Sequence, residues 1–191
     1  MITATQIEEL FGKLLSQVKD AELRRKTVEV WVEGCKTGGW QTVEELRAMP
    51  FTLLTDARGI DLVEHTIAVT EGALGLARAQ QGAYAKMPIQ ADWDRLVCGG
   101  LLHDVGKLVE IERNPAGGYR KSRSGKCARH PISGTVMAGR AGLPDEILNC
   151  IACHAKEGEG RPQTFETVLI HQADYATFDP LVMLEKGSLI L

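Results

Sequence analysis

Apolar residues recur at intervals of three and four along most of the chain, which is the spacing that places them on one face of an α-helix. No segment of five or more residues alternates convincingly between apolar and polar positions, as a half-buried β-strand would. The periodicity predicts helices over residues 5–33 as a pair, 42–49, 60–82, 92–111, 131–142, 144–156 and 164–177. We therefore predict an all-α fold, a bundle of about seven or eight helices.

A short helix separates the first part of the chain from the rest. Thr42 and Glu45 have the spacing of a capping box that opens this helix, and Pro50 closes it.

Residues 113–129 contain glycine, proline and serine but no apolar periodicity, so we expect a long loop or a hairpin there. This segment is also basic, with Arg120, Lys121, Arg123 and Lys126. Opposite an anionic substrate, such cations would supply attraction and charge-assisted hydrogen bonds. The other interpretation is a solvated surface loop, because charge runs usually mean that.

The composition adds few constraints. With 191 residues, 44% hydrophobic residues, 25% charged residues and a formal net charge of −3, the chain has the profile of an ordinary soluble protein and no basic excess for nucleic acid. It contains neither a recognisable secretory signal nor an apolar run of the roughly 18 residues that cross a membrane, so we expect a cytoplasmic protein. The five cysteines are odd in number and irregularly spaced, which favours reduced thiols over disulfides.

The chemistry is concentrated in histidines and aspartates of the predicted helices. The candidates are His65, His103, Asp104, His130, His154 and Asp174. Imidazole nitrogen and carboxylate oxygen are ligands that suit Mn, Fe, Co, Ni or Zn, and six such groups suffice for two ions if one carboxylate bridges. Taken alone, each histidine is more often a packed or surface residue than a ligand. The pattern as a whole indicates a dinuclear site.

The adjacent pair His103 and Asp104 carries the most weight because it interrupts an apolar string between residues 96 and 108. Burying an imidazole beside a carboxylate is expensive unless something such as a cation compensates. Gly99 and Gly100, just before the pair, lower helix propensity, and a close approach of helices is one reason to retain them.

The string Cys150-Ile-Ala-Cys153-His154 allows several interpretations. It matches a covalent haem-attachment motif, which we disfavour because the chain shows no export signal. The two thiols could be a redox pair or sulfur ligands, but buried cysteine acting as a small apolar residue is the favoured interpretation. His154 shares a helical face with Ile147 and Cys150, so it is expected to point inward.

These residues, in this order, resemble the HD superfamily of metal-dependent phosphohydrolases. The string "LLHDVGKL" is similar to the HD-x-GK signature of the family, "VEHTIAVTEGAL" resembles its first-histidine helix, and "LIHQADYA" resembles the segment that ends in its last aspartate. The resemblance covers about residues 60–180, and residues 1–50 have no part in it. It therefore implies an N-terminal helical segment, residues 1–50, and an HD-type metal-binding domain, residues 51–191. It implies an HD-domain-like helical bundle that holds the metal site between helices.

The resemblance also implies roles for individual residues. The ligands of a first metal would be His65, His103, Asp104 and Asp174. The presence of His130 and His154 resembles the dinuclear subset of the family, in which Asp104 would bridge two divalent ions. Iron or manganese is favoured, with Co, Ni, Zn or Mg as alternatives. Asp104 and Lys107 would be catalytic, with Lys107 meeting the substrate anion. Apart from the resemblance, the basic loop adds Arg120, Lys121 and Arg123 as candidate substrate contacts.

The function that follows is hydrolysis of a phosphate ester or anhydride in a nucleotide or other small phosphorylated compound. One alternative is a di-iron oxygenase of the same superfamily, which would cleave a carbon bond of a small anionic substrate. A regulatory module without catalysis is disfavoured by the complete ligand set, and nucleic-acid processing by the net charge of −3. The role of His171 is left undecided between a partner of a metal ligand, a substrate contact and a core residue. The sequence predicts no oligomeric state.

Overall fold

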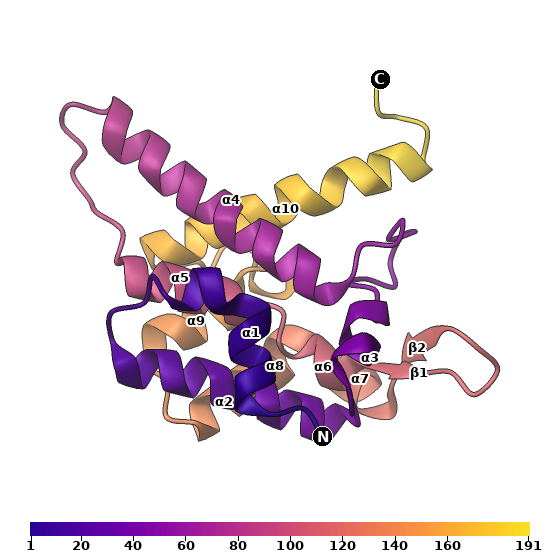
Figure 1. The fold of residues 1–191 in the computed structure, drawn as a ribbon. Coiled ribbons are helices and arrows are strands. Elements are labelled where there is room, and N and C mark those ends of the chain that lie inside the picture. The colour runs from indigo at the N-terminus through magenta and orange to yellow at the C-terminus, as the bar shows by residue number, and fades with distance from the viewer.

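The apolar stripes of the sequence become ten packed α-helices and one small hairpin in a computed structural model that describes all 191 residues (Figure 1). The helices are α1 (Ala4–Leu15), α2 (Ala21–Gly38), α3 (Val43–Ala48), α4 (Leu62–Ala83), α5 (Trp93–Leu102), α6 (Lys107–Glu110), α7 (Arg123–Cys127), α8 (His130–Arg140), α9 (Asp145–Cys153) and α10 (Phe165–Glu185). The predicted all-α class is confirmed. The number exceeds the expected seven or eight because α6 and α7 are short pieces of four and five residues.

Local sequence signals fix several of the helix ends. Thr42 caps α3 by accepting a hydrogen bond from the backbone of Glu45. Asp61 and Glu64 form a reciprocal capping box at the start of α4. Gly39 ends α2 at a φ of 80°, a left-handed conformation that glycine adopts without a steric penalty.

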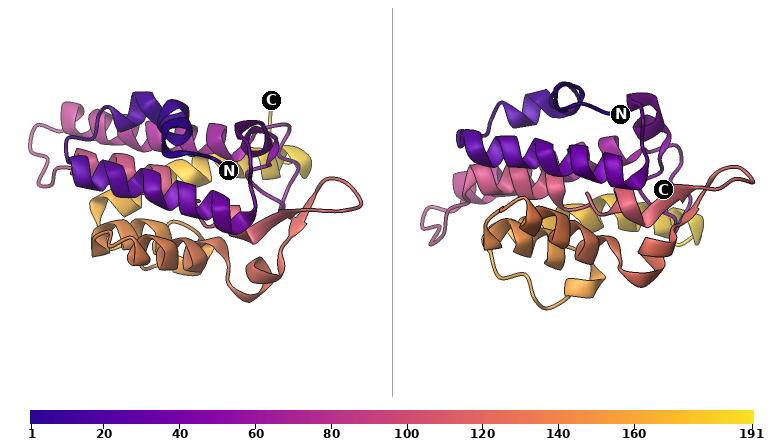
Figure 2. Two further views of the ribbon diagram at one scale, coloured as in Figure 1. Left: turned by 60° about the horizontal axis from the view of Figure 1, so that its bottom comes forward. Right: turned by 90° about the horizontal axis from the view of Figure 1, so that it is seen from below.

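Helix α5 is the centre of the bundle. It packs against α2, α4, α9 and α10, and its residues from Leu96 to Leu102 are all buried. Figure 2 shows α1 and α2 on one side of it and α8 and α9 on the other, and in Figure 1 α4 and α10 lie together across the top. The residues that follow α5 therefore emerge in the interior of the protein.

Two glycines of α5 allow this close packing. A Cβ atom on Gly100 would lie 2.7 Å from Oγ1 of Thr70 on α4, and one on Gly99 would lie 2.8 Å from Sγ of Cys150 on α9. Both distances are shorter than real side-chain contacts, so any larger residue would push the neighbouring helices apart. The glycine pair serves close helix approach, as its position before the His-Asp pair suggested.

The chain turns directly after α5, where periodicity alone predicts one continuous helix over residues 92–111. The helix ends at Leu102, and the chain resumes a helical course only at Lys107. Within this turn Gly106 fits closely against α8, because a Cβ atom there would lie 2.0 Å from the carbonyl oxygen of His130. The apolar spacing continues through the turn, so the hydrophobic pattern does not reveal it.

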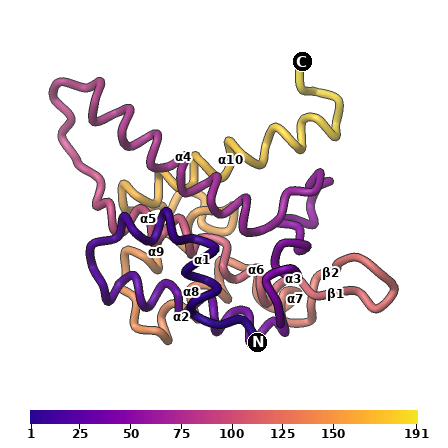
Figure 3. Tube along the Cα trace, in the orientation of Figure 1, coloured from indigo at the N-terminus to yellow at the C-terminus, as the bar shows by residue number.

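The basic segment is a hairpin followed by a short helix. Strands β1 (Ile111–Arg113) and β2 (Tyr119–Lys121) pair antiparallel, with Gly117 and Gly118 in the turn at positive φ. Figure 3 shows this hairpin projecting from the helices. The hairpin is held against the residue after α2, because the rings of Tyr119 and Trp40 stack with centroids 6.3 Å apart.

The first two helices pack closely onto the rest of the bundle. The indole Nε1 of Trp31 donates a hydrogen bond of 2.8 Å to the carbonyl of Leu101, and that of Trp40 donates one of 2.8 Å to the carbonyl of Leu108. A domain boundary near residue 50 stays a prediction. None of the helices has the length and apolar character needed to span a membrane.

Candidate metal centre

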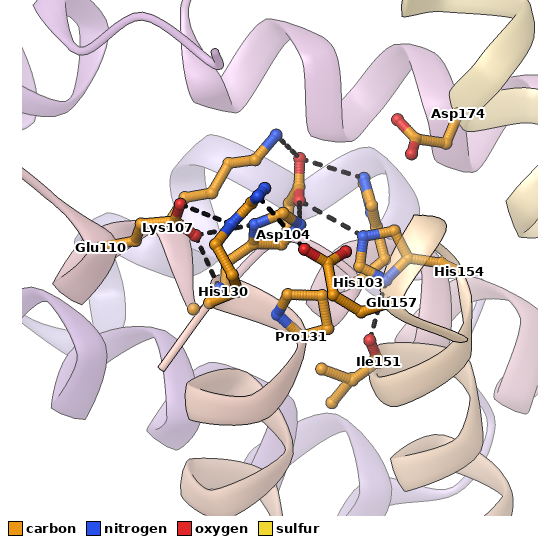
Figure 4. A network of polar contacts seen from close by, with 12 residues as sticks. His103, Asp104, Lys107, Glu110, His130, Pro131, Ile151, His154, Glu157 and Asp174 are labelled. Atoms are coloured by element: carbon orange, nitrogen blue, oxygen red, sulfur yellow. Dashed lines mark hydrogen bonds and ion pairs between the residues drawn. The ribbon is translucent and has the colours of Figure 1, made fainter. Parts of the chain in front are cut away.

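Five segments of the chain bring six side chains together near the end of α5. Figure 4 shows five of them, His103, Asp104, His130, His154 and Asp174. The residues are His65 from α4, His103 and Asp104 from the turn after α5, His130 at the start of α8, His154 at the end of α9 and Asp174 from α10. They form two groups that share Asp104. The first contains His65, His103, Asp104 and Asp174, and the second contains Asp104, His130 and His154. Within each group, one potential ligand atom of every residue lies within 4.8 Å of the others.

The two oxygens of Asp104 face different groups. Oδ2 lies 3.3 Å from Nε2 of His65 and 3.4 Å from Nε2 of His103. Oδ1 lies 3.2 Å from Nε2 of His130 and 3.5 Å from Nε2 of His154. Asp104 is therefore placed between the groups, with one oxygen available to each.

Several of these atoms are buried without a hydrogen-bond partner. They are Nε2 of His103 and His154 and Oδ1 of Asp104, while Nε2 of His65 and Oδ2 of Asp104 have only charged neighbours, Asp174 at 3.1 Å and the ammonium of Lys107 at 2.5 Å. Buried polar atoms in native proteins are almost always satisfied, because leaving them unpaired costs free energy. Two divalent cations bound by nitrogen and oxygen would satisfy this set, so the residues fit the metal ions that the sequence suggested.

Hydrogen bonds behind the imidazoles aim their Nε2 atoms at Asp104. Nδ1 of His103 lies 2.6 Å from the carbonyl oxygen of Gly100, and Nδ1 of His154 lies 2.8 Å from that of Ile151. When Nδ1 carries the proton and donates it to these oxygens, Nε2 keeps its lone pair for a metal ion. The main chain thus fixes the tautomer of both histidines.

His130 has a different partner, the carboxylate of Glu110. Oε2 of Glu110 lies 2.8 Å from Nδ1 of His130 and accepts a further hydrogen bond of 2.6 Å from its backbone N–H. The sequence did not identify Glu110, because its partner stands 20 positions later. The one local signal is an acidic residue one turn after Lys107 within a mostly apolar stretch.

The charges of the cluster suit cation binding near neutral pH. Burial lowers the pKa of His130 to about 4, so its imidazole is neutral. Burial alone would raise the pKa of Asp104, but the charge of Lys107 and the neighbouring imidazoles hold it well below its usual range. Burial also opposes ionisation of Asp174, yet the contact with His65 lowers its pKa to about 2. Both carboxylates are therefore ionised.

A cavity of about 290 Å³ opens beside the cluster. The cluster residues His130 and Asp174 form part of its wall. Charged residues at the wall are Lys107, Glu110, Lys121, Arg129, Lys156 and Glu157. Apolar and aromatic residues at the wall are Phe51, Leu53, Leu54, Ile111, Tyr175 and Phe178. The cavity gives a ligand access to the cluster and offers it both cations and an apolar surface.

The basic residues singled out in the sequence lie in different places. Lys107 and Lys121 line the cavity. Arg120 is on the exposed hairpin with its Nε atom 2.7 Å from Oε1 of Glu112, and Arg123 is an exposed residue at the start of α7, so neither lines the cavity. Two further cations at the cavity wall, Arg129 and Lys156, had no sequence signal beyond their charge.

The remaining open residues lie outside the two groups. Nδ1 of His171 lies 2.5 Å from the carbonyl oxygen of His154, so His171 forms a hydrogen bond with the main chain of this proposed ligand. Cys150 is buried, and the hydroxyl of Thr167 donates to its sulfur at 3.3 Å. Burial raises the pKa of the Cys150 thiol to about 12, so it is a packed neutral thiol.

Comparison with known proteins gives a consistent picture. The family model named HD domain matches residues 62–179. The chain is 28% identical over 168 residues to a dihydroneopterin 2',3'-cyclic phosphate phosphodiesterase of Methanocaldococcus jannaschii, an alignment that covers 86% of this chain and 66% of the relative. It is 30% identical over 173 residues to ribonuclease Y of Thermotoga maritima, covering 91% of this chain and 29% of that relative. No solved structure matches significantly.

Proposed function

The chain belongs to the HD-domain family, and from this premise we propose that it is a metal-dependent phosphohydrolase with a dinuclear centre. The observation that carries the proposal is the set of buried imidazole and carboxylate atoms that face one another without hydrogen-bond partners. A purely structural cluster would be expected to satisfy these atoms from within the protein. A pair of cations would satisfy them and balance the negative charge of the buried carboxylates.

In the proposed arrangement, one ion is held by the first group of residues and the other by the second. Asp104 would contribute to both sites, because its two oxygens are divided between the groups. Divalent ions held by these residues would lower the pKa of water and neutralise charge on a phosphoryl group. The nitrogen and oxygen donors favour Fe or Mn, with Co, Ni, Zn or Mg as alternatives.

Lys107 would bind the phosphoryl group of the substrate. Its ammonium lies at the cavity wall, 2.5 Å from Oδ2 of Asp104 and 5.4 Å from the ring centroid of Phe51. Lys156 lines the same cavity and forms no ion pair with an acidic residue, so its charge is available to an anion. Both lysines can therefore bind phosphate oxygens beside the cluster.

The cavity favours a small substrate with a planar organic group. Its volume of about 290 Å³ is at the lower end of the range of small-molecule sites. Leu53 and Leu54, which are 40% and 68% exposed, line the cavity with Tyr175 and Phe178 of α10, and these residues offer apolar surface for a ring. The relative from Methanocaldococcus jannaschii acts on dihydroneopterin 2',3'-cyclic phosphate, which is a compound of this kind. RNA, the substrate named for ribonuclease Y, is disfavoured by the size of the cavity and the net charge of −3.

A substrate screen tests this function. The chain, stripped of metal and reloaded with Mn²⁺ or Fe²⁺, would be assayed with bis(p-nitrophenyl) phosphate, adenosine 2',3'-cyclic phosphate, ATP and an RNA oligonucleotide, with and without oxygen. We expect hydrolysis of a small phosphate compound that a chelator abolishes and that oxygen does not affect. Absence of hydrolysis with every ion, or turnover that requires oxygen, would contradict the proposal, and cleavage of RNA alone would contradict the small substrate.

A matched pair of compounds tests the ring preference. Adenosine 2',3'-cyclic phosphate and glycerol 1,2-cyclic phosphate share the reactive cyclic phosphate, but only the first carries a ring base. We expect the first to bind more tightly and Leu54→Ser to reduce the difference. Leu76→Ser is the control, because Leu76 is a 39% exposed leucine of α4 outside the cavity wall.

A further inference from the structure

Glu110, the last residue of α6, contacts the cluster and the cavity cations at once. Its Oε2 atom accepts the hydrogen bonds from the backbone and ring of His130. Its Oε1 atom lies 2.8 Å from Nε of Arg129 and 3.3 Å from Nζ of Lys121. The residue is only 5% exposed, so one buried carboxylate joins a proposed ligand to two cations of the cavity wall.

The two groups of the cluster differ in the number of carboxylates they contain. The first has Asp104 and Asp174, whereas the second has only the shared Asp104. His130 belongs to the second group and has a carboxylate behind its ring, whereas His103 and His154 have main-chain carbonyls. A carboxylate in this position orients the ring and increases its basicity as a ligand, so Glu110 strengthens the group that has less negative charge of its own.

The fold holds Glu110 firmly in place. Its carbonyl accepts a hydrogen bond of 2.8 Å from the backbone N–H of Ser122. A Cβ atom on Gly125 would lie 2.5 Å from that carbonyl oxygen and 2.7 Å from Cγ of Glu110, so α7 packs directly onto the residue. The carboxylate is therefore held rigidly beside His130.

We propose that Glu110 is a positioning residue that couples the second ion subsite to the phosphate-binding side of the cavity. Oε2 orients the ring of His130 so that its Nε2 faces Asp104. Oε1 holds Arg129 and Lys121 at the wall of the cavity, where the substrate anion enters. Arg129 extends the connection, because its Nη1 atom lies 3.1 Å from Oε1 of Glu157 across the cavity wall. This role rests on the proposed two-ion function.

Two substitutions separate the contributions of the carboxylate. Glu110→Gln keeps one oxygen acceptor but removes the charge, and Glu110→Leu removes both. We expect the affinity for the second ion to fall about 10-fold to 100-fold in Glu110→Gln and further in Glu110→Leu, while the first ion binds as before. The metal content should thus decrease from two ions toward one, and KM for the phosphate compound should increase because the two cations lose their anchor.

Calorimetric titration of the metal-free chain with Mn²⁺, together with metal analysis, is the test. Glu166→Gln is the matched control, because Glu166 is also 5% exposed and also accepts a backbone hydrogen bond, from Asp92 at 2.7 Å, but touches neither group. Unchanged binding of both ions in Glu110→Gln and Glu110→Leu, or equal weakening of both ions, would overturn the role of Glu110. A wild-type chain that binds only one ion would instead overturn the two-ion centre, and this role with it.

Discussion

The ammonium group of Lys107 lies 2.5 Å from Oδ2 of Asp104, the carboxylate that both groups of proposed ligands share. The side chain of Asp104 is 1% exposed and that of Lys107 is 13% exposed, so the contact links the buried cluster to the cavity. Cations bound at Asp104 would compete with Lys107 for this oxygen. The ammonium would then be available to a phosphate oxygen in the cavity.

Replacing Lys107 should therefore weaken substrate binding without removing the metals. For Lys107→Met we expect a loss of about 10-fold to 100-fold in kcat/KM, the effect of one charge-assisted hydrogen bond, with unchanged metal content. Steady-state kinetics and metal analysis measure the two quantities. Lys86→Met, at an exposed position outside the cavity wall, is the control. Loss of metal from Lys107→Met would instead show that the lysine holds the cluster together.

The glycine of the HD-x-GK string has a structural role that a stability measurement can isolate. Because a Cβ atom on Gly106 would lie 2.0 Å from the His130 carbonyl oxygen, Gly106→Ala should destabilise the fold by about 1–3 kcal/mol. Gly75→Ala is the control, since Gly75 lies inside α4 with nothing within 4 Å of its added Cβ. There we expect a gain of about 0.5–1 kcal/mol from better helix propensity. Urea denaturation of both variants would contradict this picture if Gly106→Ala were neutral.

The metal-free chain should lose stability in acid. The pKa of His130 is lowered from 6.5 to about 4, that of Glu110 from 4.5 to about 2, and that of Asp174 from 3.8 to about 2. In each case the unfolded chain binds the proton more tightly, so the stability these groups contribute is full above their ordinary pKa and is lost as the pH falls toward the lowered value. His65 acts in the opposite sense: although burial lowers its pKa, contacts with Asp104 and Asp174 raise it overall.

The window for this loss runs from about pH 6.5 down to about pH 2. Urea midpoints of the metal-free chain, measured through the upper part of this window, should fall steadily with pH. Glu110→Gln should flatten the dependence in its lower part, where the glutamate titrates. A midpoint that stays constant or rises as the pH falls would contradict the assigned charge states.

The cysteines should react with alkylating agents according to their burial. Cys127 is exposed and should be modified first in the native protein. Burial raises the pKa of Cys35, Cys98 and Cys150 to about 12, so these thiols should resist iodoacetamide at neutral pH until the chain unfolds. Mass spectrometry of peptides gives the order. Rapid labelling of Cys150 would contradict its packed, neutral state.

The sequence was most informative where local chemistry conflicted with its surroundings. A histidine and an aspartate inside an apolar string had few explanations other than a compensating cation, and both side chains are indeed buried in the cluster. The helical class followed from periodicity, and the glycines of α5 followed from their cost in a helix. Each of these signals lies within a few residues, where spacing and physical chemistry can be combined.

The features that the sequence missed depend on contacts between distant segments. The turn after Leu102 brings Gly106 against α8, and the contact of Glu110 with His130 joins residues 20 positions apart. Helix α10 continues through Pro180 to Glu185, beyond the predicted end at residue 177. Proline is tolerated there because Ala176, whose carbonyl loses its donor, is exposed to water.

The most direct test is the metal content of Asp104→Asn beside that of the wild-type chain, both measured after reloading with Mn²⁺. The substitution keeps the size of the side chain but removes the charge that both groups share. We predict two ions per wild-type chain, and in the variant a loss of at least the second ion together with loss of metal-dependent hydrolysis. Two ions bound with unchanged affinity in Asp104→Asn would contradict the bridging role of Asp104 and the dinuclear centre built on it.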